Sequence, residues 1–369
     1  MLVSRWELRD ALELLPQEMH SKIVPAARTF VLRRTSKTMR AAVENAKLDT
    51  VVVRRSGVKF LNGAGLQDKL NGLNAWCRVT ELRLSECALG EGGGQAIAAA
   101  LRENHTLTKL CLCGNELGEG GGQAIAGALR DNHTLTKLNL HANNLGEVGG
   151  QAVSAALREN HTLTELILVF NSLGEGGGQA IAAALRVNNT LTSLNLSQNS
   201  LEEGGGQAFA AALRVNNTLT SLGLSCNALE EGAAQALAAA LRVNTTLTSL
   251  DLGYQSLGDD EQAIASALRV NSTVTSLYLC STVKGEGAAQ ALAAALCVNS
   301  TVTSLDIGEN WLGEGGAQAI AAALRVNSTL TSLDLRHNEL GEGGKSVVRQ
   351  SWGNRGGTLV LSPQQTIYD

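Results

Sequence analysis

Residues 107–132 read LTKLCLCGNELGEGGGQAIAGALRDN, and this stretch decides the fold of the chain. Leu110, Leu112 and Leu117 are followed by a glycine run and then by an alanine-rich segment that ends at Leu129. Closely related stretches precede and follow it along the sequence. A repeated unit of this length is typical of a solenoid, in which each unit buries its apolar face only against its neighbours.

About ten such units follow one another between residues 79 and 345. Equivalent leucines recur at a constant spacing, except that the interval between Leu250 and Leu277 is one residue shorter than the others. The strand leucines are Leu82, Leu110, Leu138, Leu166, Leu194, Leu222, Leu250, Leu277, Leu305 and Leu333. The pattern resembles the leucine-rich repeat, and its 28-residue form resembles the ribonuclease-inhibitor-like class. This resemblance implies a right-handed α/β solenoid, or horseshoe, with parallel strands on its concave face and helices on its convex face.

Each unit is expected to contain one short strand, one turn and one helix. Leu110 and Leu112 alternate with other residues, so both leucines face the interior of the solenoid. Asn115 is expected to satisfy backbone groups of the turn. The glycine run then permits a tight backbone before a helix that starts near Gln123. Ile125 and the leucine four residues later place an apolar stripe of that helix against the strands.

Three units depart from the pattern, and two of them are adjacent. The asparagine of the turn is replaced by Cys87 in the first unit, by Gln255 in the seventh and by Thr282 in the eighth. Lys284 also replaces the leucine that follows Thr282, and the shortened interval falls in the same place. We therefore expect a change of curvature or a loosened turn between Asp251 and Lys284.

The sequence divides into four parts. Residues 1–48 contain apolar residues at helical spacing and are predicted to form a small helical module. Residues 49–78 resemble a degenerate repeat that caps the first unit. Residues 79–345 form the solenoid, and residues 346–369 contain a short apolar run that is expected to close its other end.

The N-terminal module has a second interpretation. Its residues Leu15-Pro16-x-Glu18, Ile23, Leu32, Ser36-Lys37 and Met39-Arg40 resemble, in that order, an F-box. This resemblance implies that residues 15–43 dock onto the scaffold of a ubiquitin ligase. Met39 stands where that family commonly has Trp, and the segment is a few residues short. A helical cap on the solenoid is the alternative.

Charge separates the N-terminal segment from the repeats. Residues 1–59 contain twelve Lys or Arg against six Asp or Glu, whereas residues 60–369 contain 18 and 28. An acidic body argues against a nucleic-acid ligand and favours a protein partner with a basic surface. No run of about 18 apolar residues occurs, and the seven cysteines show no paired spacing. We expect no membrane span, and a cytoplasmic or nuclear protein with reduced thiols.

The tripeptide Asn-x-Thr recurs after each helix. The asparagines are Asn104, Asn132, Asn160, Asn188, Asn216, Asn244, Asn271, Asn299 and Asn327. Such tripeptides are N-glycosylation acceptors in secreted proteins. Their regular place favours a structural role instead, because Asn tolerates the left-handed conformation that often ends a helix.

We expect no catalytic residue, no cofactor and no metal. The hexapeptide GEGGKS at Gly341 ends like a phosphate-binding loop, but Glu339 stands where that motif needs its first glycine. Cys111 and Cys113 share a strand face, and His141 lies on the next strand, so three soft ligands converge. A structural zinc site normally has four ligands. We therefore interpret both cysteines as ordinary free thiols.

The repeats differ from one another mainly at one, three and four positions after the first strand leucine. Because the framework is preserved, this diversity indicates that the concave face has adapted to a ligand, and drift at solvated positions is the alternative. One candidate group is Ile167, Val169 and Phe170. The second is Asp251, Tyr254, Tyr278, Asp306, Glu309, Asp334 and Arg336. Aromatic residues surrounded by charge are typical of protein-binding hot spots.

These features predict a non-catalytic scaffold that binds a protein on its concave face. An F-box-like substrate adaptor of a ubiquitin ligase is the first alternative. The repeats also resemble those of the Ran GTPase-activating proteins, which is the second. That family acts through one rim of the solenoid and an acidic tail, and the sequence ends at Asp369 without an acidic run.

Overall fold

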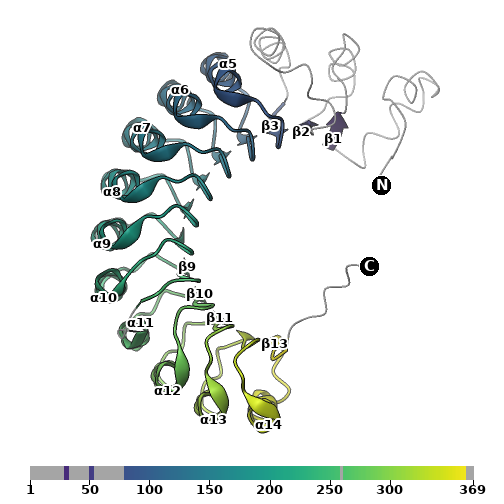
Figure 1. Cartoon of the computed structure of the whole chain (residues 1–369), viewed down its shortest axis with the longest axis vertical. Helices are drawn as coiled ribbons and strands as arrows, with labels where there is room; N and C mark the ends of the chain where they lie inside the picture. The colour runs from purple at the N-terminus through teal and green to yellow at the C-terminus, as the bar shows by residue number, and fades with distance from the viewer. Residues whose placement is uncertain (1–28, 33–49, 54–78, 258–260, 363–369) are drawn as a thin grey trace, which may run out of the picture. The chain divides into compact units, whose positions relative to one another are not determined.

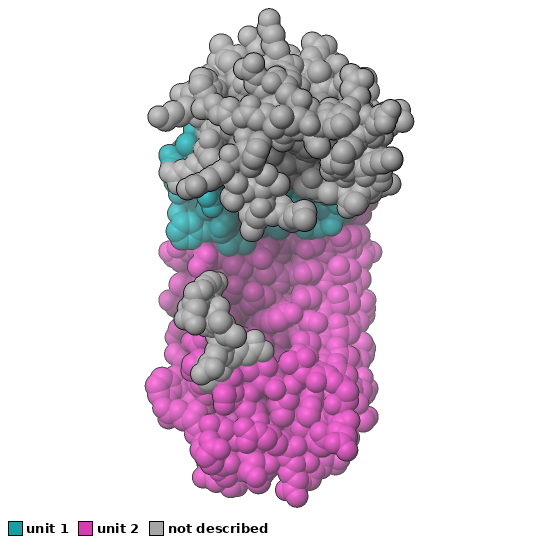
Figure 2. Space-filling model, turned by 90° about the vertical axis from the view of Figure 1, so that its right-hand side faces the viewer, with its two compact units in different colours: residues 1–172 teal, residues 173–369 magenta. Residues whose placement is uncertain are grey.

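A strand, a turn and a helix recur in the same order along the chain. The computed structural model describes residues 29–32, 50–53, 79–257 and 261–362. The chain falls into two compact units, residues 1–172 (unit 1) and residues 173–369 (unit 2), which Figure 2 shows in different colours. We describe each unit by itself.

Unit 1 contains a parallel sheet covered by helices on one face. Its strands are β1 (Thr29–Leu32), β2 (Thr50–Val53), β3 (Glu81–Leu84), β4 (Lys109–Cys111), β5 (Lys137–Asn139) and β6 (Glu165–Ile167). Each strand pairs in parallel with the next one in the sequence. The helices are α5 (Gly90–Glu103), α6 (Gly118–Asp131) and α7 (Gly146–Glu159), and Figure 1 shows them on the same side of the strands.

Unit 2 repeats this arrangement. Its strands are β7 (Ser193–Asn195), β8 (Ser221–Gly223), β9 (Ser249–Asp251), β10 (Ser276–Tyr278), β11 (Ser304–Asp306), β12 (Ser332–Asp334) and β13 (Thr358–Val360). They also pair in parallel with their sequence neighbours. The helices are α8 (Gly174–Leu185), α9 (Glu202–Leu213), α10 (Glu231–Leu241), α11 (Glu261–Leu268), α12 (Gly285–Leu296), α13 (Gly313–Leu324) and α14 (Gly341–Trp352). No helix in the described part of the chain is long and apolar enough to cross a membrane.

The core of each unit lies between the strands and the helices. Leu110 and Leu112 are fully buried, and so are Ile125 and Leu129 on α6. The alternation along the strand therefore predicted the inward face correctly. Cys111, which lies between the two leucines, is only half-buried. We call the face of the sheet opposite the helices, to which such residues point, the open face of the unit.

The helices begin earlier than the sequence indicated. The prediction that the second repeat's helix starts near Gln123 was wrong, because α6 begins at Gly118 and includes the glycine run. The glycines are needed where helices of adjacent repeats approach each other. A Cβ atom on Gly94 would lie 2.7 Å from Cα of Gly121, and one on Gly206 would lie 2.5 Å from Cβ of Ala233. The lack of a side chain therefore sets the spacing between repeats.

The asparagine of each turn connects neighbouring repeats. Asn143 is fully buried, and its Nδ2 donates hydrogen bonds to the carbonyl oxygens of Leu112 and Leu140, each at 2.9 Å. Its Oδ1 accepts a hydrogen bond from the backbone N–H of Asn115 at 3.1 Å. Each turn thus satisfies backbone groups of the repeat before it. This confirms the expectation that the asparagine serves the turn, and it adds the link between repeats.

The two irregular repeats keep this link by other chemistry. Oε1 of Gln255 accepts a hydrogen bond from the backbone N–H of Leu229 at 2.9 Å. Oγ1 of Thr282 donates to the carbonyl oxygen of Leu252 at 2.8 Å. Helix α11, which follows Gln255, has only eight residues. The turns stay closed at both positions, while a change of curvature in this region remains a prediction.

The Asn-x-Thr asparagines end the helices of unit 1, but not in the conformation that we expected. Asn132 has φ −87° and ψ 124°, which is extended rather than left-handed. Its Oδ1 instead accepts hydrogen bonds from the backbone N–H groups of Thr134 and Leu135, at 3.1 and 2.8 Å. Its Nδ2 donates to the carbonyl oxygen of Leu101 at 2.9 Å. The side chain makes the turn, so the backbone needs no left-handed residue.

The N-terminal prediction is corrected at one place. Residues 29–32, which fall inside the predicted helical module, form strand β1 and pair with β2. The run Phe30-Val31-Leu32 contains aromatic and branched side chains that favour a strand. Helical spacing alone does not distinguish such a short apolar run from a strand. The rest of residues 1–48, including most of the F-box-like segment, lies outside the described residues.

Candidate protein-binding surface

The residues that directly follow the first strand leucine of each repeat form a row across the open face of unit 2. Tyr278 is paired with Asp251 on one side and with Asp306 on the other, and Asp306 is paired with Asp334. The parallel register therefore brings four of the predicted site residues next to one another, from four different repeats. The three aspartates are half-buried and Tyr278 is exposed.

The aspartates of this row also hold the backbone. Oδ1 of Asp251, Asp306 and Asp334 each accepts a hydrogen bond at 2.9 Å from the backbone N–H two residues further on. Asn139 and Asn195 make the same bond at the equivalent position, at 2.9 and 3.0 Å. One carboxylate oxygen of each aspartate thus has a structural task, which sequence reasoning did not foresee. In Asp306 and Asp334 the other oxygen, Oδ2, pairs with Arg336.

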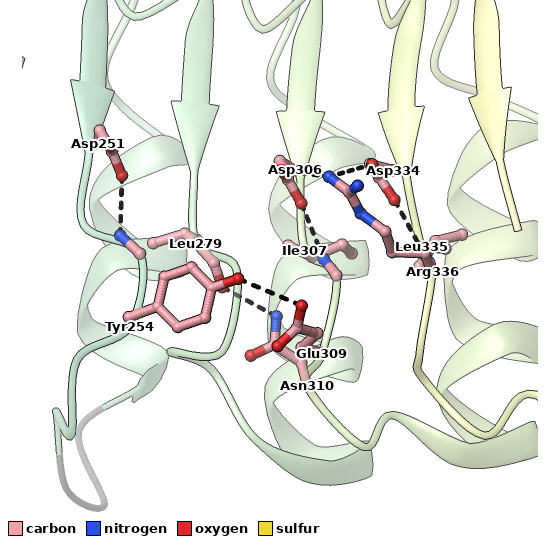
Figure 3. A network of polar contacts seen from close by, with 12 residues as sticks. Asp251, Tyr254, Leu279, Asp306, Ile307, Glu309, Asn310, Asp334, Leu335 and Arg336 are labelled. Atoms are coloured by element: carbon pink, nitrogen blue, oxygen red, sulfur yellow. Dashed lines mark hydrogen bonds and ion pairs between the residues drawn. The ribbon is translucent and has the colours of Figure 1, made fainter. Parts of the chain in front are cut away.

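Arg336 lies between two of these carboxylates, as Figure 3 shows. Its Nη2 is 2.9 Å from Oδ2 of Asp334 and 3.7 Å from Oδ2 of Asp306. Burial raises the pKa of the Asp306 carboxyl above its usual value, and the charge of Asp334 adds to this effect. Arg336 therefore offsets part of the negative charge of the row instead of standing as a separate contact residue.

Tyr254 and Glu309 meet across a whole repeat. The hydroxyl of Tyr254 donates a hydrogen bond to Oε1 of Glu309 at 3.2 Å (Figure 3). The neighbouring thiol of Cys280, from the repeat between them, is the largest cause of the raised pKa of the tyrosine. Tyr254 nevertheless remains 50 % exposed. Its ring is held in place while much of its surface stays in water.

Sequence reasoning missed Trp311. This side chain is 62 % exposed and follows Asn310, next to Glu309 in the same turn. Its φ of +57° lies in the left-handed region, which a bulky residue seldom occupies. Tyr254 shares that conformation, with φ +56°. The equivalent position holds Ala, Ser, Asn or Glu in most other repeats, and an isolated Trp among them was the signal that could have revealed it.

The three candidate residues of unit 1 form a smaller apolar group. Ile167 closes strand β6, and Val169 and Phe170 follow it in the turn. Ile167 and Val169 are half-buried, whereas Phe170 is 56 % exposed with φ +58°. Phe170 occupies in its repeat the position that Tyr254 occupies in unit 2.

A second exposed apolar row lies at the helix ends of unit 2. It consists of Val187, Val215, Val243, Val270, Val298 and Val326, each more than half exposed. In unit 1 the equivalent position is acidic and pairs with an arginine of the preceding repeat, as Asp131 does with Arg102 and Glu159 with Arg130. Among the described residues, the exposed large apolar side chains are these valines and the aromatic residues Phe170, Tyr254, Tyr278 and Trp311.

The GEGGKS hexapeptide and the Cys111–Cys113 pair, which suggested a phosphate site and a metal site, do not have the surroundings that such sites need. Helix α14 already begins at Gly341, and Nζ of Lys345 lies 2.8 Å from Oε1 of Glu342. Cys111 and Cys113 do lie together, as described below. Within the described residues, however, no group of three or more His, Cys, Asp or Glu side chains is arranged to hold a metal ion.

Comparison with solved structures gives two matches. A leucine-rich repeat-containing protein, LegL7 from Legionella pneumophila, is 22% identical with a TM-score of 0.51, and the match covers 75% of this chain and 91% of that one. The actin-binding site 2 of leiomodin-1 is also 22% identical, with a TM-score of 0.35, and the match covers 38% of this chain and 84% of that one. No curated protein matches the chain.

The sequence itself matches a known repeat family. The family described as "Leucine Rich repeat" matches residues 78–98, 103–126, 131–154, 159–182, 187–210, 215–238, 298–321 and 326–346. These segments make up about half of the sequence, and each described repeat has the strand, turn and helix that the pattern predicts. The chain belongs to the leucine-rich-repeat family.

Proposed function

We propose that this protein is a non-catalytic scaffold that binds a protein segment over the open face of unit 2. One observation carries the proposal: Tyr254 and Tyr278, from two successive repeats, are exposed there beside half-buried carboxylates, and Trp311 of the next repeat is exposed in the turn that follows Glu309. Such aromatic residues contribute most to protein-binding energy when they are surrounded by polar groups that exclude water. We place the repeats in the ribonuclease-inhibitor-like class because of their 28-residue period and the helix in each unit.

Charge supports a basic partner. The open face of unit 2 carries Asp251, Asp306, Asp334 and Glu309, and Arg336 offsets only part of that charge. A basic segment would find Oδ2 of Asp251 and the carboxylate of Glu309 beside the aromatic rings. Electrostatic attraction of this kind mainly raises the association rate and weakens with salt. A cytoplasmic or nuclear location is part of the proposal and rests on the seven cysteines, which show no paired spacing.

A differential affinity purification tests the proposal. The full chain and its Tyr254→Ala, Tyr278→Ala variant are immobilised side by side, and the proteins retained from a cell extract are quantified by mass spectrometry. A protein retained by the original chain and depleted with the variant is the expected result. A third bait, Val215→Ser, Val243→Ser, tests the valine row of the same unit. Partners lost only with the valine variant would contradict the assignment to the open face.

The alternative functions stay predictions. The F-box-like hypothesis predicts that the full chain retains a ubiquitin-ligase scaffold and that Leu15→Asp abolishes this retention. The resemblance of the repeats to those of Ran GTPase-activating proteins predicts that the chain accelerates GTP hydrolysis by a Ran-type GTPase.

A further inference from the structure

Cys111 and Cys113 form a pair of neighbouring thiols on the open face of unit 1. Cys111 is the last residue of β4, and Cys113 lies in the turn that follows. Their Sγ atoms are 2.9 Å apart, and both side chains are half-exposed. Oγ of Ser85, from the preceding repeat, lies 3.4 Å from Sγ of Cys111.

The framework holds the two sulfurs together. Leu110 and Leu112 are fully buried, so the residues that alternate with them must point to the open face. Nδ2 of Asn115 donates a hydrogen bond to the carbonyl oxygen of Cys113 at 3.2 Å, which fixes the turn. Residues two apart in a strand have Cα atoms about 6.6 Å apart, which is within the range that a disulfide spans. The two cysteines can therefore be joined while both leucines stay in the core.

The hydrogen bond between the two thiols shifts their pKa values in opposite directions. Either thiol can donate in this pair, and a bond donated by Cys113 lowers the pKa of Cys111 to about 5 although burial acts in the opposite direction. The same bond raises the pKa of Cys113. Ser85 and the charge of Arg83 also favour the thiolate of Cys111. We assign the role of nucleophile to Cys111, because Oγ of Ser85 lies against its sulfur, and Cys113 is positioned to react second.

We propose that Cys111 and Cys113 are a thiol–disulfide exchange site for low-molecular-weight disulfides of the glutathione class. The Cys111 thiolate attacks one sulfur of the oxidised glutathione, the S–S bond of glutathione breaks, and one glutathione thiolate leaves. Cys113 then loses its proton to water and attacks Sγ of Cys111. The mixed disulfide breaks, the second glutathione thiolate leaves, and the Cys111–Cys113 bond forms. The protein loses two electrons, and one glutathione disulfide becomes two thiols.

The first test is the pH dependence of alkylation, measured on the full chain by site-resolved mass spectrometry. A thiolate with a pKa of about 5 is as abundant at pH 6 as at pH 8, to within roughly a tenth, so the alkylation rate of Cys111 should hardly change. Cys226 is the matched control, because it is also half-exposed and its pKa is raised. Its rate should fall about 100-fold over the same interval. An equal fall at Cys111 would overturn the proposal.

The second test follows the products of oxidised glutathione at pH 7. The original chain should gain an internal disulfide in the peptide that contains residues 111–113, without a lasting glutathione adduct. Cys113→Ser should instead accumulate glutathione on Cys111, and Cys111→Ser should form neither product at this site. Cys226→Ser should behave like the original chain. A stable glutathione adduct on the original chain, or no reaction at Cys111, would each show that the pair is not an exchange site. Circular dichroism of each variant checks that the repeats remain folded.

Discussion

The hydroxyl of Tyr254 donates a hydrogen bond to the carboxylate of Glu309, 3.2 Å away, although a complete repeat separates the two residues. The residue between them in the same row is Ser281, which is small enough for the tyrosine ring to reach across. The ring is thereby ordered before any partner binds. A side chain that is already ordered loses less conformational entropy on binding.

Removing the two tyrosines should weaken partner binding. For a partner found by differential purification, Tyr254→Ala together with Tyr278→Ala is expected to cost at least about 2 kcal/mol of binding free energy, as is usual for central aromatic anchors. Isothermal titration calorimetry gives the dissociation constants. Melting temperatures should change little, because both side chains are exposed.

Two further variants show which part of the surface binds the partner. Tyr254→Phe keeps the ring and removes the hydrogen bond to Glu309 that orders it. The free energy of partner binding should therefore weaken by about 0.5–1.5 kcal/mol, the usual net value of one hydrogen bond. Arg186→Ala with Arg214→Ala changes two exposed residues at the helix ends. This control should bind within about 0.5 kcal/mol of the original chain. Normal binding by the tyrosine variant and weak binding by the arginine variant would place the partner on the helix side.

Replacing Asp306 by Asn should stabilise the fold at neutral pH. Because its pKa is raised in the folded protein, the neutral carboxyl contributes stability below the pKa of the unfolded chain, and this contribution is lost as pH rises through the folded pKa. Asn keeps the acceptor for the N–H of Gly308, as Asn139 and Asn195 do in their repeats. The melting temperature of Asp306→Asn should therefore exceed that of the original chain at pH 7. The difference should shrink as the pH approaches the ordinary value of 3.8.

Asp306→Ala is the control for this prediction. It removes the charge and also the acceptor, so it should be less stable than Asp306→Asn by about 1 kcal/mol. Urea unfolding at pH 7 measures both variants. If the asparagine variant is as unstable as the alanine variant, the charge of Asp306 is not what lowers the free energy of unfolding of the original chain at pH 7.

Two adjacent asparagines provide a test of the helix-end turns. Oδ1 of Asn216 accepts hydrogen bonds from Thr218 and Leu219, and its Nδ2 donates to the carbonyl oxygen of Leu185 at 2.8 Å. Asn216→Ala should destabilise by at least about 2 kcal/mol, because it leaves several buried backbone groups without partners. Asn217 is exposed, and Asn217→Ala should change stability by less than about 0.5 kcal/mol. Equal urea midpoints for the two variants would contradict the structural role of the buried asparagine.

Deleting one complete repeat should leave a folded protein. Removal of residues 222–249 joins Ser221 to Leu250 and recreates a strand that reads Ser-Leu-Asp, like β11 and β12. Each repeat contacts mainly its neighbours, so the shorter chain should keep its helix and strand signals per residue in circular dichroism. Removal of residues 222–235 alone takes out half of that repeat, breaks the register and should cause extensive unfolding. Similar spectra for both deletions would argue against the repeat register described above.

The sequence by itself determined the repeat, its strand leucines and the inward face of each strand. These features depend on a local pattern that recurs in every unit, so a few copies are sufficient to recognise them. It also pointed to the variable residues of the open face, because the strict framework makes every departure visible. The start of the helices was misplaced, since glycine usually disfavours a helix and the reason for glycine here lies in the neighbouring repeat.

Only the tertiary structure decided how the variable residues are used. Tyr254 and Glu309 are far apart in the sequence and meet only because successive repeats stack in register. Asp306 and Asp334 share Arg336 for the same reason, while their Oδ1 atoms serve the backbone. Trp311 is exposed, and its backbone takes a left-handed conformation that a bulky residue seldom adopts. Such contacts depend on the distance between stacked repeats, which the close packing of the helices sets and no single repeat encodes.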